Sequence, residues 1–347
     1  MSWNPNVYSS RARKSSPKKK KWGPRRKGRR PSGGWGDALG RRTDPELLRN
    51  VVSGVLVVDK PVGLTSHDVV QIIRRGTGIR RSGHAGTLDP RASGVLVVLL
   101  GPAVRLSEWV ASSDKRYMAT LRLGAATDTY DAEGRITDES PCPDITEDEF
   151  RAMLAQFKGE IEQVPPPYSA IRVKGKRAYE LARKGQKVEL KPRKIHVYEL
   201  DMLEWAPPEV VLDVHCSSGT YIRSLAHDIG RALGCGAHLV GLRRTQSGRF
   251  TLRDAVPLQR LQEAFVQGEW YKYLLPAADA LADWPLIELN ADEVDKVRHG
   301  HSLPSRWENL PQDQLLRAVT EQGDLVAVMQ YNAEEDVVKP RKVFFVT

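Results

Sequence analysis

A glycine-rich turn that ends in Asp89-Pro90 and leads into an apolar run constrains this chain more than any other segment. Gly83 and Gly86 permit tight or left-handed backbone geometry, and Pro90 restricts Asp89 to extended conformations. Residues 94–100 are apolar throughout and of strand length, so they predict a buried strand. The carboxylate of Asp89 is therefore expected on a rigid turn, where a single reacting group would be held against a substrate. Taken alone, an Asp in such a turn more often bonds to its own backbone.

The rest of the pattern predicts a mixed α+β body followed by a smaller β-rich region. In the body, strands are expected at 54–59, 94–100, 117–123, 195–203 and 210–215. Helices are expected at 65–76, 103–111, 146–157, 220–233 and 257–265. Beyond Trp284, short strands are expected at 286–289, 315–319, 325–331 and 343–346, with a helix at 291–299.

The net charge of +10 is concentrated at the N-terminus. Residues 1–49 hold 15 Lys or Arg and 3 Asp or Glu, whereas the remainder holds 38 basic and 40 acidic residues. Residues 1–50 lack apolar periodicity, which predicts a disordered basic tail. We interpret this tail as an arm that binds phosphates, with a passive solvated tail or a mitochondrial presequence as alternatives. The expected units are this tail, a main domain at 51–280 and a β-rich domain at 284–347.

Several classes of protein are disfavoured by what the sequence lacks. Cys142, Cys216 and Cys235 form no CxxC pair and are odd in number, which argues against a disulfide framework and favours a reducing, cytoplasmic compartment. No HExxH spacing and no GxxxxGK[ST] loop occurs, so neither a metal nor a cofactor is expected. The apolar runs are far shorter than the ~20 residues of a membrane-spanning helix, so no membrane association is expected.

Five sequence blocks, in order and spacing, resemble the TruB family of tRNA pseudouridine synthases. The most specific is GHAGTLDPRASGVLVVLLG at 83–101. The others are VLVVDKPVGLTSHDVV at 55–70, KRYMATLRLGAATDTYDAEG at 115–134, VPPPYSAIRVKGKRAYELARKG at 164–185 and CSSGTYIRSLAHDIGRALGCGAHLVGLRRTQSGRFTL at 216–252. The resemblance covers roughly residues 53–345 and follows the bacterial layout of the family.

This resemblance implies a pseudouridine synthase catalytic domain at 51–280, with a mixed, mainly antiparallel central sheet. It also implies a PUA-like RNA-binding domain at 284–347. The activity it implies is isomerisation of uridine to pseudouridine, at position 55 in the T-loop of tRNA. Base flipping and covalent catalysis by an aspartate would carry the reaction without a cofactor.

The resemblance also assigns roles to individual residues by matched position. It makes Asp89 the nucleophile, and Arg223 its ion-pair partner, which Asp131 would orient through a bidentate contact. The other positions that match active-site or base-binding residues of the family are His84 (RNA near the flipped base), Tyr117 (stacking on the base), Tyr221, Lys60 and Leu242. Without the resemblance, these would be interpreted as loop, turn, surface or core residues.

Basic residues within the fourth block predict contacts with RNA phosphates, a solvated surface being the alternative. They are Lys174, Lys176, Arg177, Arg183 and Lys184. The chain departs from the family pattern at Arg91, where an apolar residue is usual, and at Ser218, where a lysine is common. Both changes are expected to affect the rim of the site and not the catalytic groups.

The expected partner is tRNA, with no obligatory protein partner and a monomeric state. One alternative is a synthase that acts on another RNA, including one within a guide-dependent complex. The other is a non-catalytic RNA-binding protein or RNA chaperone that keeps the fold. The presence of Asp89, Tyr117, Tyr221 and Arg223 argues against the second.

Deleting residues 1–49 tests the interpretation of the tail. Because binding to phosphates releases counterions, the truncated chain should bind tRNA more weakly at low salt and with a shallower dependence on salt concentration. Titrations of both chains at several salt concentrations measure this. Equal slopes would make the tail a passive appendage.

Overall fold

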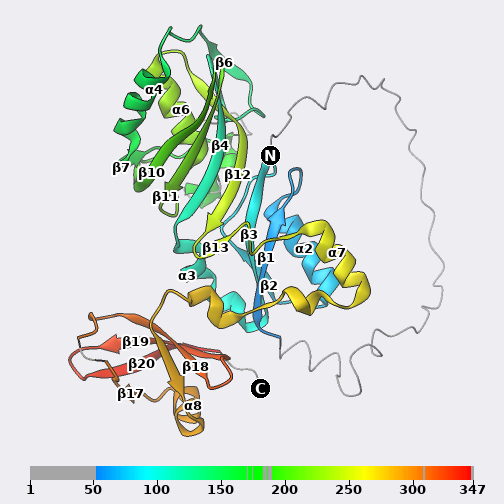
Figure 1. The fold of residues 1–347 in the computed structure, drawn as a ribbon, viewed down its shortest axis with the longest axis vertical. Coiled ribbons are helices and arrows are strands. Elements are labelled where there is room, and N and C mark those ends of the chain that lie inside the picture. Colours follow the sequence, from blue (N-terminus) through cyan, green and yellow to red (C-terminus); the bar gives the residue numbers. More distant parts are fainter. Residues whose placement is uncertain are drawn as a thin grey trace, which may run out of the picture.

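The computed structural model describes residues 52–169, 171–173, 175–182, 186, 190–307 and 309–344. The basic tail predicted at 1–50 lies outside the described residues. Within them, a large unit built on one long sheet is followed by a small β-rich unit, as Figure 1 shows. No described helix is long and apolar enough to cross a membrane.

The large unit is built on an 11-stranded sheet. Eight strands form a continuous path, in the order β14 (Val256–Pro257), β1 (Gly54–Lys60), β3 (Ala92–Leu100), β12 (Ala237–Ser247), β4 (Lys115–Leu123), β11 (Glu209–Cys216), β10 (Arg193–Ala206) and β7 (Gly159–Gln163). The β1–β14 and β3–β12 pairs are parallel, and the other neighbours along the path are antiparallel. The prediction of a mixed, mainly antiparallel central sheet is therefore confirmed.

Strands β1 and β3 are buried on both faces, as their unbroken apolar runs predict. One set of alternating residues, including Val57 and Val97, packs into a core that the C-terminal unit shares. The other set, including Leu56 and Leu96, packs under α2 (Ser66–Thr77) and α7 (Leu258–Gln267). Each strand thus lies in the middle layer of a three-layer arrangement.

The other half of the sheet buries mainly one face. Helices α4 (Glu147–Leu154) and α6 (Ile222–Leu233) cover alternate residues of β4, β10 and β11. Tyr117 and Leu242 are half-buried and pack against both this core and the core under α2 and α7. The two helical layers therefore meet over the middle of the sheet, where Figure 1 shows β4 and β12 passing between the pairs of helices.

Local signals account for most helix boundaries. Capping boxes start α2 at Thr65 with Asp68 and α4 at Thr146 with Glu149. Helix α2 ends at a left-handed Gly78, two residues beyond the predicted end. The helix predicted at 103–111 is a 3₁₀ turn, η1 (Gly101–Leu106), followed by α3 (Ser107–Ser112).

Short elements complete the large unit. They are β2 (Ser82–Ala85), β5 (Ala125–Thr127), β6 (Ile136–Glu139), η2 (Ala155–Phe157), β8 (Arg172–Val173), β9 (Lys176–Arg177), α5 (Ala178–Ala182), β13 (Phe250–Thr251), η3 (Trp270–Tyr273), β15 (Leu275–Pro276) and η4 (Ala277–Leu281). Of these, β2 pairs with β3 and carries the chain towards Asp89.

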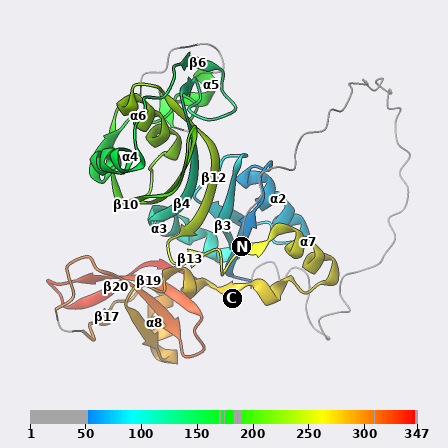
Figure 2. The ribbon, with the colours of Figure 1, turned by 45° about the horizontal axis from the view of Figure 1, so that its top comes forward.

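The C-terminal unit is a five-stranded sheet with one helix, which confirms the β-rich expectation. Its elements are β16 (Leu286–Leu289), α8 (Ala291–Arg298), β17 (Leu303–Pro304), β18 (Leu315–Thr320), β19 (Leu325–Asn332) and β20 (Val337–Val343). The last strand, β20, pairs with β19 and ends at Val343, so it precedes the strand predicted at 343–346, of which residues 345–346 lie outside the described residues. Val328 and Phe344 join the core shared with β1 and β3, which holds the unit beneath α3 (Figure 2).

Strand β12 has no counterpart among the predicted strands, although it occupies the centre of the sheet. Its sequence, AHLVGLRRTQS, lacks a period of two. Two register shifts against β4, near Gly241 and Thr245, explain the broken alternation. The strand is parallel to β3 at one side, so it joins the two halves of the sheet.

The contact between β3 and β12 requires a glycine. Gly94 has φ +100°, and a Cβ there would lie 2.2 Å from the Arg244 carbonyl oxygen. Gly94→Ala is therefore expected to lower the free energy of unfolding by about 3 kcal/mol or more. Gly159→Ala is the matched control, because Gly159 has φ +87° with open space around it, and should cost about 1 kcal/mol. Equal losses in denaturant unfolding would contradict the close approach.

Candidate active site

The backbone around Asp89 is fastened by side chains from β1 and α2. The Ser66 hydroxyl donates to the Leu88 carbonyl at 3.0 Å and accepts from the Leu88 amide at 2.8 Å. Lys60 Nζ donates to the Pro90 carbonyl at 3.4 Å. Asp89 lies between these two fastened residues, so its backbone is fixed while its side chain remains 49% exposed. A carboxylate in this position is held rigidly and can still be reached by a substrate.

Arg244 fastens the start of the same loop from β12. Its Nη2 donates to the Gly86 carbonyl at 3.0 Å, and its Nε donates to the Val95 carbonyl at 2.8 Å. Gly86 has φ +87°, and a Cβ there would meet the guanidinium at 3.4 Å. Arg244 is 1% exposed, so these carbonyls replace the water that a buried guanidinium loses.

Lys60 is completely buried, although it is a lysine. Its Nζ also donates to the carbonyls of Pro61 at 2.9 Å and Leu64 at 2.6 Å. Burial lowers the pKa of Lys60 to about 8, and the nearby Asp89 carboxylate partly opposes this shift. Lys60 therefore lies near Asp89, and its contacts hold the turn that precedes α2.

Arg223 joins two carboxylates from different parts of the chain. Its Nη2 lies 3.1 Å from Oδ2 of Asp89, and its Nη1 lies 3.3 Å from Oδ2 of Asp131. The prediction of a bidentate contact between Asp131 and Arg223 is wrong. Oδ1 of Asp131 accepts instead from Thr129 Oγ1 at 2.6 Å and from the Glu133 amide at 3.0 Å. Arg223 is only 11% exposed, so both of its ion pairs are shielded from water on that side.

Tyr221 and Arg223 reach the site from the start of α6. Tyr221 is the N-cap residue of this helix, and Gln163 pairs with both its amide (2.8 Å) and its carbonyl (3.1 Å). Arg223 Nη2 also donates to the Tyr168 carbonyl at 3.2 Å. Burial raises the pKa of Tyr221, and Asp89 is one of the charges that act on it. The first turn of α6 thus holds both residues beside Asp89.

Tyr117 and His84 are uncharged groups around Arg244. Burial raises the pKa of Tyr117, an effect that the charge of Arg244 partly opposes, so its hydroxyl keeps its proton. Burial and the charge of Arg244 lower the pKa of His84, whose buried Nδ1 has no partner. Both rings are therefore neutral near pH 7.

The structure thus places the matched residues in one region, where β1, β3, β4, β12 and α6 converge. Leu242 lies on β12 opposite Ala119, between the two helical cores. Arg91 forms an exposed ion pair with Glu133 at 3.2 Å, which spans the rim between the loops of the two carboxylates. The sequence does not mark Ser66 and Arg244 as site residues, because a serine at a helix start and an arginine in an irregular strand carry no distinctive spacing.

The predicted RNA-binding stretch is only partly described. Lys174, Arg183 and Lys184 lie outside the described residues. The backbone of Lys176 and Arg177 forms β9, which pairs with β8. Their role in binding RNA stays a prediction.

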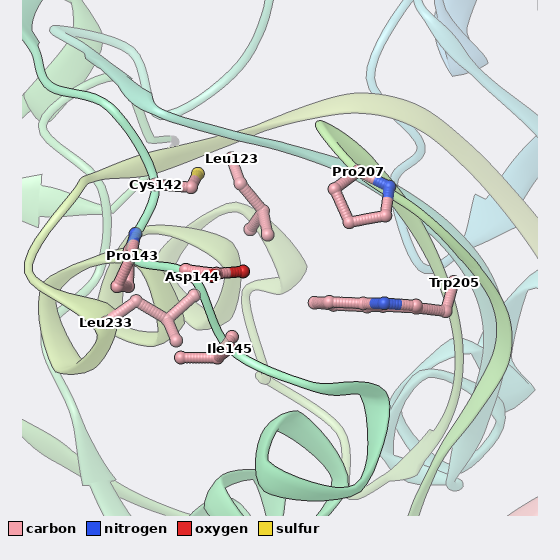
Figure 3. A pocket seen from close by; sticks show the side chains of 8 residues that line it. All are labelled: Leu123, Cys142, Pro143, Asp144, Ile145, Trp205, Pro207 and Leu233. Carbon is pink, nitrogen blue, oxygen red and sulfur yellow. The ribbon is translucent and has the colours of Figure 1, made fainter.

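A cavity of about 300 Å³ lies away from this region, at the far end of β4 (Figure 3). Leu123 lines it six residues along the strand from Tyr117, roughly 20 Å away. Cys142 also lines it, with its Sγ 3.2 Å from that of Cys235, and all three cysteines are free. Among the described residues, no group of three or more His, Cys, Asp or Glu could hold a metal ion.

Two family models match the chain over adjoining segments. The TruB family pseudouridylate synthase N-terminal domain matches residues 74–222, which include Asp89, Tyr117, Asp131 and Tyr221. The tRNA pseudouridylate synthase B C-terminal domain matches residues 223–282. Both matches end before the five-stranded C-terminal unit begins.

Known relatives match over most of their length. A tRNA pseudouridine synthase B from Symbiobacterium thermophilum is 46% identical over 252 residues, which cover 72% of this chain and 82% of that protein. Another from Solibacter usitatus is 43% identical over 278 residues, which cover 80% of this chain and 95% of that protein. The chain belongs to the TruB family.

Solved structures of more distant relatives share the fold of this TruB-family chain. A Cbf5-Nop10-Gar1 complex contains a chain with a TM-score of 0.67 and 30% identity, covering 87% of this chain and 88% of that one. An H/ACA RNP bound to a substrate RNA containing 2'-deoxyuridine gives a TM-score of 0.67 at 28% identity, covering 88% of each chain. This coverage exceeds what residues 52–282 could supply, so the likeness extends into the C-terminal unit.

The depressed pKa of Lys60 has a measurable consequence for stability. Because the folded-state pKa is about 8 and the ordinary value is 10.5, the unfolded state binds more protons between these values. The contribution of Lys60 to the free energy of unfolding should therefore rise with pH through this window. Wild type and Lys60→Met are compared by denaturant unfolding from pH 7 to 10.5.

The difference between the two proteins isolates Lys60 from the other groups that titrate at high pH. Lys115 provides a parallel case, since burial lowers its pKa to about 8 as well. Wild type should gain stability relative to Lys60→Met as the pH rises. A difference that stays constant with pH would contradict the depressed pKa of Lys60.

Proposed function

We propose that this chain isomerises uridine to pseudouridine in tRNA, at position 55 of the T-loop, with Asp89 as the nucleophile. The observation that carries the proposal is the ion pair of Asp89 with Arg223 at 3.1 Å, on a loop whose backbone is fastened on both sides of Asp89. The family membership and the names of the relatives support tRNA as the substrate class.

The reaction breaks the bond between N1 of the base and C1′ of the ribose, rotates the base, and joins C5 to C1′. C5 loses a proton and N1 gains one, so the conversion needs no redox partner and no energy source. Asp89 can act by attacking C1′ or by assisting departure of the base, because both routes need one carboxylate beside the glycosidic bond. Arg223 orients that carboxylate, and Asp131 orients Arg223 from the other side.

A uridine stacked in an RNA loop must leave its stack to reach Asp89. Extrusion costs a few kcal/mol, which a new stacking surface can offset. Tyr117 is half-buried on β4 between the two helical cores, so it can offer one ring face to the base. His84 and Leu242 would hold the neighbouring groups, and Lys60 would keep the loop in place.

The other RNA contacts in this proposal come from the surroundings of the site. The basic tail and the residues at 174–184 would bind phosphates, and the C-terminal unit, as a PUA-like domain, would bind the acceptor side of the tRNA. We expect a monomer in the cytoplasm that needs no protein partner.

A guide-dependent role is the second candidate, because the solved chains with a TM-score of 0.67 come from Cbf5 complexes and an H/ACA RNP. Those chains are 28–30% identical to this one, whereas the proteins named tRNA pseudouridine synthase B reach 43–46%. The higher identity favours the stand-alone tRNA enzyme.

Asp89→Asn tests the proposal directly. Asparagine keeps the shape of the side chain but lacks the charged nucleophile, so the rate of pseudouridine formation on an unmodified tRNA transcript should fall by more than about 1000-fold. Asp201→Asn is the control, because Asp201 is exposed on β10 and pairs with Lys158. Sequencing that detects pseudouridine locates the modified position.

Three results would overturn parts of the proposal. Equal rates for wild type and Asp89→Asn would remove Asp89 as the nucleophile. Tight tRNA binding by wild type without modification would favour the RNA chaperone. Modification only in the presence of a guide RNA would favour the second candidate.

A further inference from the structure

Tyr130 adopts a backbone conformation that its residue type disfavours. Its φ is +65°, and bulky residues occupy this left-handed region only when their surroundings require it. It lies directly before Asp131, which holds Arg223. An outlier at this position calls for an explanation in terms of the site.

The backbone on both sides of Asp131 is tied to β12. The Leu239 amide donates to the Tyr130 carbonyl at 3.0 Å, and the Ala132 amide donates to the Leu239 carbonyl at 2.9 Å. These bonds place Asp131 alongside Leu239 in a parallel bridge. With this positive φ, the Tyr130 ring contacts His227 while the carboxylate of the next residue, Asp131, contacts Arg223.

The Tyr130 ring stacks on His227 of α6. The ring centroids are 3.9 Å apart and the planes differ by 9°. Burial lowers the pKa of His227, and its Nδ1 is buried without a partner, so the imidazole is neutral near pH 7. Burial also raises the pKa of Tyr130, so the phenol keeps its proton. The pair is therefore a contact between two neutral aromatic rings, which does not depend on salt.

His227 lies four residues after Arg223, so the two side chains leave the same face of α6. One helix thus carries both Arg223 and the ring that holds the loop of Asp131. Two threonines bind Asp131 within its own loop. Thr127 Oγ1 donates to the Asp131 carbonyl at 2.8 Å, and Thr129 Oγ1 donates to Oδ1 of Asp131 at 2.6 Å. The stack is a tie between this loop and α6 that does not use Arg223 itself.

We infer that the Tyr130–His227 stack is a positioning device that sets the separation of Asp131 and Arg223, and through Arg223 the orientation of Asp89. Neither ring belongs to the catalytic groups, since both act through Asp131. The inference rests on the proposed isomerisation of uridine. A small displacement of a positioned group can cost up to about 100-fold in rate, so losing the stack should affect the chemical step.

Four variants separate positioning from stability. Y130F and H227F keep a stacked pair of rings and should retain the single-turnover rate. Y130G and H227A lose the stack and should lower this rate about tenfold, with little change in the Kd for tRNA. Release of tritium from C5 of labelled uridine in a tRNA transcript measures the rate.

Thermal unfolding distinguishes a positioning role from a purely structural one, because a structural role would lower the rate only together with the Tm. Glycine accepts the positive φ of position 130 without strain, so Y130G should keep its Tm within about 3 °C of wild type while its rate falls. H227A gains no such relief and should lose both rate and Tm. A rate for Y130G equal to that of wild type, or a loss that only follows a fall in Tm, would overturn the inference.

A double variant tests whether the stack acts through Asp131. Adding Y130G to D131N should cause no further loss of rate, because Asp131 can no longer hold Arg223 as a carboxylate. A further tenfold loss in the D131N background would overturn the inference. Inactive wild-type protein would instead contradict the proposed function, so the two failures are distinguishable.

Discussion

The side chain of Arg223 is only 11% exposed. Its guanidinium therefore needs partners, because a buried charge without them is costly. Its two carboxylates come from loops about 40 residues apart, and neither loop belongs to the helix that carries Arg223. The pairing therefore depends on how two halves of one sheet meet. Helix α6 covers the half built from β4, β10 and β11, whereas Asp89 precedes β3 in the other half.

Strand β12 makes that meeting possible, because it pairs with β3 on one side and with β4 on the other. Arg244 projects from it to the Gly86 carbonyl, so the same strand that joins the halves also fastens the loop of Asp89. Gly94 admits the Arg244 backbone where a side chain would collide. The site is thus rigid because it lies at the joint of the sheet, where displacement of either half would break several hydrogen bonds at once.

The sequence was sufficient for elements whose signals are local. The apolar run at 94–100 predicts the buried strand β3, and the capping box at Thr146 predicts the start of α4; both predictions are confirmed. It was insufficient for β12, whose shifted registers hide the alternation, and for Arg244, whose partners are carbonyls distant in the chain. The resemblance to the TruB family named Asp89, Arg223 and Asp131 together. It did not reveal that Asp131 shares its second oxygen with Thr129 and the Glu133 amide, since that depends on the shape of a loop.

The charge of the described residues around Asp89 resolves an electrostatic difficulty. An enzyme that presents a carboxylate to RNA must limit the repulsion between that group and the phosphates, yet the chain beyond residue 49 has 38 basic and 40 acidic residues. Lys60 and Arg244 lie buried beneath the loop, and Arg223 lies beside it, so positive charge is concentrated where water screens it least. Under the proposed function, attraction of RNA from a distance would come from exposed basic groups, which act over a Debye length and exchange readily with salt. Positive charge that stabilises Asp89 must be buried beside it, whereas positive charge that attracts RNA must be exposed, so the two tasks need separate basic groups.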